Sequence, residues 1–331
     1  MIGRRTLLAG LGCLPIAAVA RAADAAGVMR IDPGLDRIIA PSARVEFLAS
    51  GFRWAEGPVW AARQDCLFFN DPPSNILYRW RAGDGAKPFL SPSGLQTPVP
   101  TGIREAGLNG LAIDADGALI AADSGTRAIV RIDLASGERR ILADRFEGKR
   151  FNSPNDLCIA ASGAIYFTDP TYGLAEGDAS PLRELDQCGL YRLAPDGTVN
   201  LLDGDHRRPN GVALSPDGRT LYLALSDERQ PEVLTYALDG DGLATERRLF
   251  RDMRAELAQG LPGLPDGIKV DARGHVFATG PGGVHVCAPD GQLLGMIRTG
   301  KAIANCAIDA AGGRLFLTSA DRLAVIALQS L

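Results

Sequence analysis

Apolar and polar residues alternate in short runs along most of the chain, and turns that contain glycine separate these runs. Alternation with a period of two is typical of half-buried β-strands, and a pair such as Asp-Gly between two runs is typical of a tight hairpin. The arrangement repeats six times, in units that begin near positions 56, 109, 155, 210, 266 and 305. The spacing is about 50 residues, which is a usual length for a four-stranded propeller blade.

Six units of this length predict an all-β fold. We expect a six-bladed β-propeller of four-stranded antiparallel blades, because closing the ring leaves only short, protected strand edges. The strand before Glu56 is expected to complete the last blade. Two β-sandwiches are the alternative, but the middle of the sequence has no Pro/Ser-rich or charged linker to join them. The best amphipathic segment, Asp252 to Gln259, predicts a short helix on a connection.

Two stretches lack strand alternation and predict long loops. The first runs from Leu90 to Gly107 and contains three prolines, and the second runs from Thr171 to Gln187. Long loops on a rigid scaffold often cover functional sites, although a surface insertion without a function is the alternative.

The start of the chain predicts an export signal. Arg4 and Arg5 precede an apolar run from Thr6 to Ala20, and Ala20 and Ala22 offer a cleavage site between small residues. The arginine pair favours the twin-arginine route over an ordinary Sec signal. The run is shorter than the roughly 20 residues that a membrane span needs, so we expect a periplasmic or secreted protein with no membrane contact after cleavage. The expected division is a signal peptide over 1–22, an N-terminal extension over 23–44 and a single propeller domain over 45–331.

Composition and motifs exclude several function classes. The 331 residues include 35 Lys and Arg against 39 Asp and Glu, a net charge of −4. Because nucleic-acid binders usually show a basic excess, no nucleic-acid partner is expected. The sequence has no G-x-S-x-G elbow, P-loop, dinucleotide fingerprint or C-x-x-C pair, and its three histidines have no metal-ligand spacing.

Each of the six units carries an oxygen-bearing side chain where its first apolar run begins. These marker residues are Glu56, Asn109, Asn155, Asn210, Asp266 and Asn305. In a propeller the innermost strands face one channel, so equivalent positions should converge. Two carboxylates and several amides suit a hard cation such as Ca²⁺, Mg²⁺ or Mn²⁺. Turn chemistry is the alternative explanation of the Asn-Gly and Asp-Gly pairs. Catalysis would then be metal-assisted, with a polarised carbonyl and a water delivered by a carboxylate.

With these residues identified, the chain resembles the SMP-30/gluconolactonase/LRE-like family, whose fold is a six-bladed propeller. The matching segments are AEGPVW (55–60), LNGL (108–111), ADRFEGKRFNSPND (143–156), YFTDP (166–170), RPNG (208–211) and LPDG (264–267). The resemblance implies one divalent cation, with Ca²⁺ the first choice and Mn²⁺, Mg²⁺, Zn²⁺ or Fe²⁺ the others. Its implied ligands are Glu56, Asn155, Asn210 and Asp266.

The resemblance also implies a reaction and a partner. The reaction is hydrolysis of a sugar lactone, typically an aldonolactone such as glucono-1,5-lactone, to the aldonic acid. Asp266 is the implied water-activating residue and Asp156 a second candidate base. The implied substrate-binding residues are Asn109, Asn152 and Arg150. The small-molecule lactone is the expected partner, and the chain is expected to be a monomer or a weak oligomer.

One position departs from the family pattern. Ser124 stands in Ala122–Thr126, where relatives often carry a histidine, and this leaves the identity of the lactone open. Two other functions also stay open: a related hydrolase of phosphotriester type, and a non-catalytic sugar-binding propeller in which the ion is structural.

Overall fold

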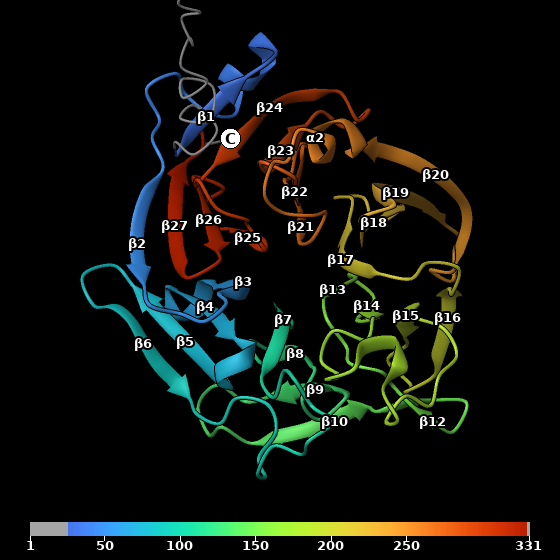
Figure 1. The fold of residues 1–331 in the computed structure, drawn as a ribbon. Helices are drawn as coiled ribbons and strands as arrows, with labels where there is room; N and C mark the ends of the chain where they lie inside the picture. Colours follow the sequence, from blue (N-terminus) through green and yellow to red (C-terminus); the bar gives the residue numbers. More distant parts are fainter. Residues whose placement is uncertain (1–25, 330–331) are drawn as a thin grey trace, which may run out of the picture.

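Each alternating run of the sequence forms a strand, and successive strands pair in antiparallel hairpins. The computed structural model describes residues 26–329. Its sheets stand around a central axis as a six-bladed β-propeller, so the predicted fold is confirmed (Figure 1). The predicted signal peptide over residues 1–22 lies outside the described residues.

The blades follow one another in chain order. The first three are β3 (Glu56–Ala61), β4 (Cys66–Asp71), β5 (Ile76–Arg81) and β6 (Gly85–Leu90); β7 (Leu108–Ile113), β8 (Leu119–Asp123), β9 (Ala128–Ile132) and β10 (Arg139–Ala143); and β13 (Leu157–Ile159), β14 (Ile165–Asp169), β15 (Gly189–Leu193) and β16 (Val199–Asp203). A two-stranded ribbon of β11 (Arg145–Phe146) and β12 (Lys149–Arg150) lies on the connection between blades 2 and 3.

The last three blades complete the ring. They are β17 (Pro209–Leu214), β18 (Thr220–Asp227), β19 (Gln230–Leu238) and β20 (Ala244–Asp252); β21 (Ile268–Val270), β22 (Val276–Gly280), β23 (Gly283–Cys287), β24 (Leu293–Arg298) and β1 (Gly27–Arg30); and β25 (Asn305–Ile308), β26 (Arg314–Ser319), β27 (Arg322–Ala327) and β2 (Glu46–Ser50).

Helical structure is confined to connections. Helix α2 (Arg254–Ala258) lies within the segment predicted to be helical. The 3₁₀ turns are η2 (Pro33–Arg37), η3 (Ala62–Gln64), η4 (Pro72–Ser74) and η5 (Gly177–Ala179). Within residues 26–329, no helix combines the length and apolar character that crossing a membrane requires.

The N-terminal segment closes the ring. As predicted, β2 completes the last blade by pairing antiparallel with β27, with Glu46 opposite Val325. Figure 1 shows this as a blue strand beside the red C-terminal blade. Strand β1 pairs with β24, with Gly27 opposite Arg298, and so adds a fifth strand to blade 5. Part of the predicted extension over 23–44 is therefore built into the sheet of that blade.

The core lies between the blades. Among the described residues, six apolar clusters each join two neighbouring blades. Between blades 1 and 2, for example, Phe68 and Leu77 pack with Leu119 and Val130. Because each sheet has a neighbour on both faces, the inner strands β4 and β8 are buried at every position. The blades thus form a rigid frame around the axis.

The two predicted loops are present and contact each other. The first joins β6 to β7, and the second joins β14 to β15. Ile103 and Leu174 form an isolated β-bridge between them. The backbone N–H of Arg104 donates to the carbonyl of Gly173 at 2.7 Å. Each loop therefore supports the other.

Candidate functional site

The innermost strands of the six blades meet around the axis. Strands β3, β7, β13, β17, β21 and β25 contact their neighbours in this order, and β25 contacts β3. Main-chain hydrogen bonds link them: Gly110 N–H donates to Asn155 O at 2.7 Å, and Gly211 N–H donates to Asp266 O at 3.1 Å. These bonds place the marker residues of neighbouring blades next to each other.

The glycines that follow four of the marker residues are required by this close approach. A Cβ on Gly57 would lie 1.9 Å from the Asn109 carbonyl oxygen, and a Cβ on Gly211 would lie 2.0 Å from that of Asp266. Gly110 and Gly267 are equally confined. Asn109-Gly110 and Asn210-Gly211 lie within strands β7 and β17, so turn chemistry does not explain these pairs.

Strand bulges turn the marker side chains toward the axis. The register shifts between Glu56 and Val59 in β3, between Leu108 and Leu111 in β7, and between Pro209 and Val212 in β17. A bulge adds one residue to a strand and redirects the side chain there. The marker residues can therefore face the central channel while the rest of each strand keeps its apolar packing.

Five of the six marker residues line one cavity of about 530 Å³. They are Glu56, Asn109, Asn155, Asn210 and Asp266, and they include all four residues predicted to bind the cation. The sixth, Asn305, supports the site: its Nδ2 donates to Glu56 Oε1 at 3.0 Å. The structure thus brings together side chains that lie up to 249 positions apart in the sequence.

Several oxygens of this group have no hydrogen-bond partner. Glu56 Oε2, Asn109 Oδ1 and Asn210 Oδ1 are buried and unpaired, while Asn210 Nδ2 donates to Ser226 Oγ at 2.8 Å. An unpaired buried polar atom is costly, and in native proteins it usually has a partner. The cavity therefore offers acceptor oxygens to a bound group.

The carboxyl groups here repel one another. Burial raises the pKa of Glu56 to about 7, against the hydrogen bond from Asn305, which lowers it. Burial, followed by the negative charges of Glu56 and Asp156, raises the pKa of Asp266 well above its ordinary value. The positive charge of Lys269 acts in the opposite direction and lowers the pKa of Glu56 and Asp156.

This donor set fits a hard divalent cation. Unpaired amide and carboxylate oxygens are the ligands such ions prefer, and a cation would offset the repulsion between the carboxylates. Within the described residues, no three His, Cys, Asp or Glu side chains gather as a metal cluster. The fit therefore depends on the amide oxygens of Asn155 and Asn210 as well as on Glu56 and Asp266.

The other predicted site residues lie outside the cavity lining. Asp156 is buried, and its Oδ1 accepts a hydrogen bond from Leu157 N at 2.9 Å. The Arg150 guanidinium donates to the carbonyl of Thr126 at 2.6 Å. Ser124 Oγ donates to the carbonyl of Pro154 at 2.9 Å. These side chains bind the main chain of neighbouring segments.

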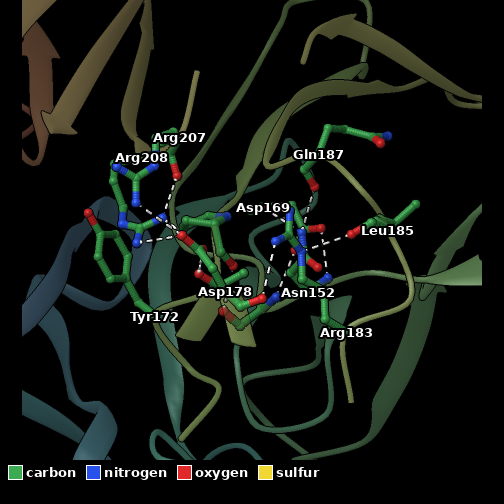
Figure 2. A network of polar contacts seen from close by, with 12 residues as sticks. Asn152, Asp169, Tyr172, Asp178, Arg183, Leu185, Gln187, Arg207 and Arg208 are labelled. Carbon is green, nitrogen blue, oxygen red and sulfur yellow. Dashed lines mark hydrogen bonds and ion pairs between the residues drawn. The ribbon is translucent and has the colours of Figure 1, made fainter. Parts of the chain in front are cut away.

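Asn152 anchors the loop over residues 171–187. Its Nδ2 donates to the carbonyls of Asp169 at 3.1 Å and Gln187 at 2.9 Å, and the residue is fully buried (Figure 2). Its backbone N–H donates to Asp169 Oδ2 at 2.7 Å. Of the three residues predicted to bind substrate, the structure places only Asn109 in the cavity.

Residues that the repeat pattern did not identify complete the cavity. Its polar wall includes Glu105, Tyr172, Ser226 and Glu228, and its apolar wall includes Trp54, Leu257, Leu261, Leu264 and Ile303. The two long loops supply Glu105 and Tyr172. The sequence feature that could have identified these residues was the prediction that such loops cover a site.

A larger hollow, of about 760 Å³, lies at the turns of blades 2 and 3. It contains none of the marker residues. Its carboxylates Asp114 and Asp116 already contact Arg131, at 2.7 and 3.3 Å. We therefore assign the candidate site to the cavity on the axis.

Comparison with known proteins finds sugar lactonases among the similar proteins. Residues 54–321 match the family described as SMP-30/Gluconolactonase/LRE-like region. A gluconolactonase of Zymomonas mobilis is 42% identical, with 97% of this chain and 96% of that protein covered. A 6-deoxy-6-sulfogluconolactonase of Pseudomonas putida is 31% identical, with 73% of this chain and 74% of that protein covered. The solved gluconolactonase XC5397 of Xanthomonas campestris superposes with a TM-score of 0.80 at 34% identity, covering 92% of this chain and 96% of that one.

Proposed function

Because this chain belongs to the SMP-30/gluconolactonase/LRE-like family, we propose that it is a divalent-metal-dependent hydrolase that opens an aldonolactone to the aldonic acid. Similarity to gluconolactonases over nearly the whole chain supports sugar lactone hydrolysis as the reaction class. The observation that carries the metal-dependent form is the set of oxygen-bearing side chains, one from each of four blades, in a single cavity.

The residues proposed to hold the cation are Glu56, Asn155, Asn210 and Asp266. When bound, the cation supplies Lewis-acid polarisation of a carbonyl group. Ca²⁺ is the first choice, because the ligands are all oxygen and include neutral amides. Mn²⁺, Mg²⁺, Zn²⁺ and Fe²⁺ are the alternatives to test.

The cavity residues account for the rest of the reaction. Asp266 is the proposed base that takes a proton from the attacking water, whose oxygen forms a bond to the lactone carbonyl carbon. The ring C–O bond then breaks, and the ring oxygen receives the proton and becomes a hydroxyl group. Asp266 lines the cavity and Asp156 does not, which favours Asp266 for this role.

The substrate is held by the polar wall. Asn109 Oδ1 is buried and has no partner, so it can accept a hydrogen bond from a substrate hydroxyl. The apolar wall can face the C–H groups of the sugar ring. The polar and apolar walls together suit a molecule that carries both hydroxyl groups and C–H groups.

The experiment measures the acid that hydrolysis of glucono-1,5-lactone releases, by titration at constant pH. We expect chelation to remove turnover, and addition of one of the five cations to restore it. Asp266→Ala is expected to lower kcat by about 100-fold or more, the size of effect expected for a positioned acid or base. Unchanged turnover after either change would refute the metal-dependent proposal.

Two controls make this test specific. Asp241→Ala alters an exposed carboxylate outside the cavity lining and should leave turnover unchanged. A phosphotriester in the substrate panel separates lactone hydrolysis from the related hydrolase chemistry. Tight sugar binding without turnover of any lactone would identify a binding propeller instead.

A further inference from the structure

The cavity contains a carboxylate that the reaction above does not use. Glu105 lies near the end of the loop between β6 and β7, and its side chain lines the cavity together with Asn109. Its Oε2 is buried and has no hydrogen-bond partner. The side chain as a whole keeps 19% of its surface exposed and forms part of the cavity wall.

The neighbours of Glu105 leave it only partly satisfied. Burial raises the pKa of this carboxyl group, and the neighbouring Arg104 and Asn109 side chains act to lower it. Arg104 approaches Oε1 to 3.8 Å, but its side chain is 52% exposed and it donates to the carbonyl of Tyr172. A hydrogen-bond donor on a ligand would therefore give Oε2 the partner that it lacks.

Hydrogen bonds fix the main chain of the loop that carries this carboxylate. The Asn75 side chain binds the loop main chain, since its Nδ2 donates to Leu95 O at 2.9 Å and its Oδ1 accepts from Gly94 N at 2.7 Å. Gly107 N–H donates to the carbonyl of Pro72 at 3.0 Å. A binding group on an ordered segment pays little entropy when it contacts a ligand. The main chain at Glu105 is thus ordered before substrate arrives, and its own N–H donates to Gly173 O at 3.3 Å.

The chemistry of the unpaired atoms selects the ligand. An ionised carboxylate and an amide oxygen accept hydrogen bonds and cannot donate them. In a lactone the carbonyl and ring oxygens are also acceptors, so among the polar groups of the substrate only hydroxyl groups can donate to Glu105 Oε2 and Asn109 Oδ1.

We infer that Glu105, with Asn109, is the specificity-determining residue that recognises ring hydroxyl groups and restricts the enzyme to polyhydroxylated lactones. This inference rests on the proposed function and names the feature of the substrate that the same cavity recognises. A site built to bind a hydroxyl group strongly rejects an analogue without it, because its own polar atoms are then left unpaired.

The test compares two lactones of equal ring size, glucono-1,5-lactone with hydroxyl groups and δ-valerolactone without them. For Glu105→Gln and Glu105→Ala in the full-length protein, we expect kcat/KM for the sugar lactone to fall about 10- to 100-fold, mainly through KM. The kcat/KM for δ-valerolactone should stay within about twofold of wild type. Glu176→Gln, an exposed carboxylate on the neighbouring loop, is the matched control and should change neither value.

Each other result has a definite meaning. Equal losses on both lactones, or a loss of cation binding measured by calorimetry, would overturn the specificity role, and so would unchanged kinetics. If wild type turns over neither lactone, the proposed function fails, whereas active wild type with unaffected variants rejects only this inference. If both variants misfold, the wild-type enzyme is tested with deoxy-gluconolactones. A kcat/KM equal to that for glucono-1,5-lactone would contradict hydroxyl recognition. A lower kcat/KM for lactones that lack one particular hydroxyl group would support it.

Discussion

Single residues at the axis serve packing and chemistry at the same time. The Asn-Gly and Asp-Gly pairs combine an oxygen-bearing side chain with a glycine that lets two inner strands approach. At Gly211 a methyl group would lie 2.0 Å from a neighbouring carbonyl oxygen. The same short approach lets the main-chain N–H of Gly211 donate to Asp266 O. The close packing that forbids a side chain at the glycine therefore also positions the residue before it.

Away from the axis, one buried carboxylate links stability to pH. Asp203 at the end of β16 accepts hydrogen bonds from Asp205 N–H at 2.8 Å, the Tyr236 hydroxyl at 2.7 Å and Arg247 at 3.0 Å. Burial raises the pKa of Asp203, but His206 and the hydrogen bonds from Asp205 N–H and Tyr236 outweigh it, so the pKa lies below its ordinary value. Because the folded state favours the ionised form, this stabilisation is present above the unfolded pKa and is lost as pH falls through the folded pKa.

We expect Asp203→Asn to lower the free energy of unfolding by about 1–3 kcal/mol at pH 7, because charged hydrogen bonds are lost. The difference in unfolding free energy between the variant and wild type should narrow below about pH 4, where the carboxyl group of the unfolded chain takes up a proton. Urea unfolding at pH 7, 5 and 3 measures this. Asp205→Asn, a change at a side chain that is 79% exposed, should cost less than about 0.5 kcal/mol. A gap of constant size at all three pH values would contradict the linkage.

Among the elements, an ion pair between Asp178 and Arg208 clamps the loop over residues 171–187. Both oxygens of Asp178, on η5, accept from the Arg208 guanidinium at 2.9 Å (Figure 2). Arg208 also lies over the Tyr172 ring, 5.9 Å from its centroid. Tyr172 lines the cavity, so the clamp connects the loop to the cavity wall.

Arg208→Ala is expected to lower kcat/KM for the lactone about tenfold, because the wall residue Tyr172 loses its support. Unfolding free energy should fall by only about 1 kcal/mol, the cost of a partly exposed ion pair. Arg207→Ala is a close control, since Arg207 is 54% exposed and contacts Asp178 at 3.3 Å. Kinetics and limited proteolysis of the two variants measure the difference. Equal effects of both variants would argue against the clamp.

The whole ring is closed by strands from opposite ends of the sequence. β2 is the outer strand of a blade whose other three strands are the last in the chain. Without β2, the edge of β27 and the apolar cluster between blades 6 and 1, which includes Leu48, would be exposed. Closure therefore needs both β2 and the C-terminal strands.

Deletion of residues 1–50 should abolish cooperative unfolding or lower Tm by more than about 10 °C, since an exposed strand edge and an open cluster are costly. Deletion of residues 1–25 removes no described strand and should leave Tm within about 2 °C of wild type. Calorimetry of the two truncated chains compares them. A fully stable 51–331 chain would show that closure does not need β2.

The sequence by itself determined the repeat number, most strands, the closing strand and the ring of marker residues. These features follow from alternation, turn residues and a fixed spacing, which act locally and recur six times. Only the tertiary structure decided which other polar groups reach the cavity. Asn152 and Arg150 bind the main chain outside it, while Glu105 and Tyr172 enter it from loops. The path of a loop is set by hydrogen bonds to segments remote in the sequence, such as Asn75 to Leu95 and Asp178 to Arg208, and no local pattern encodes those contacts.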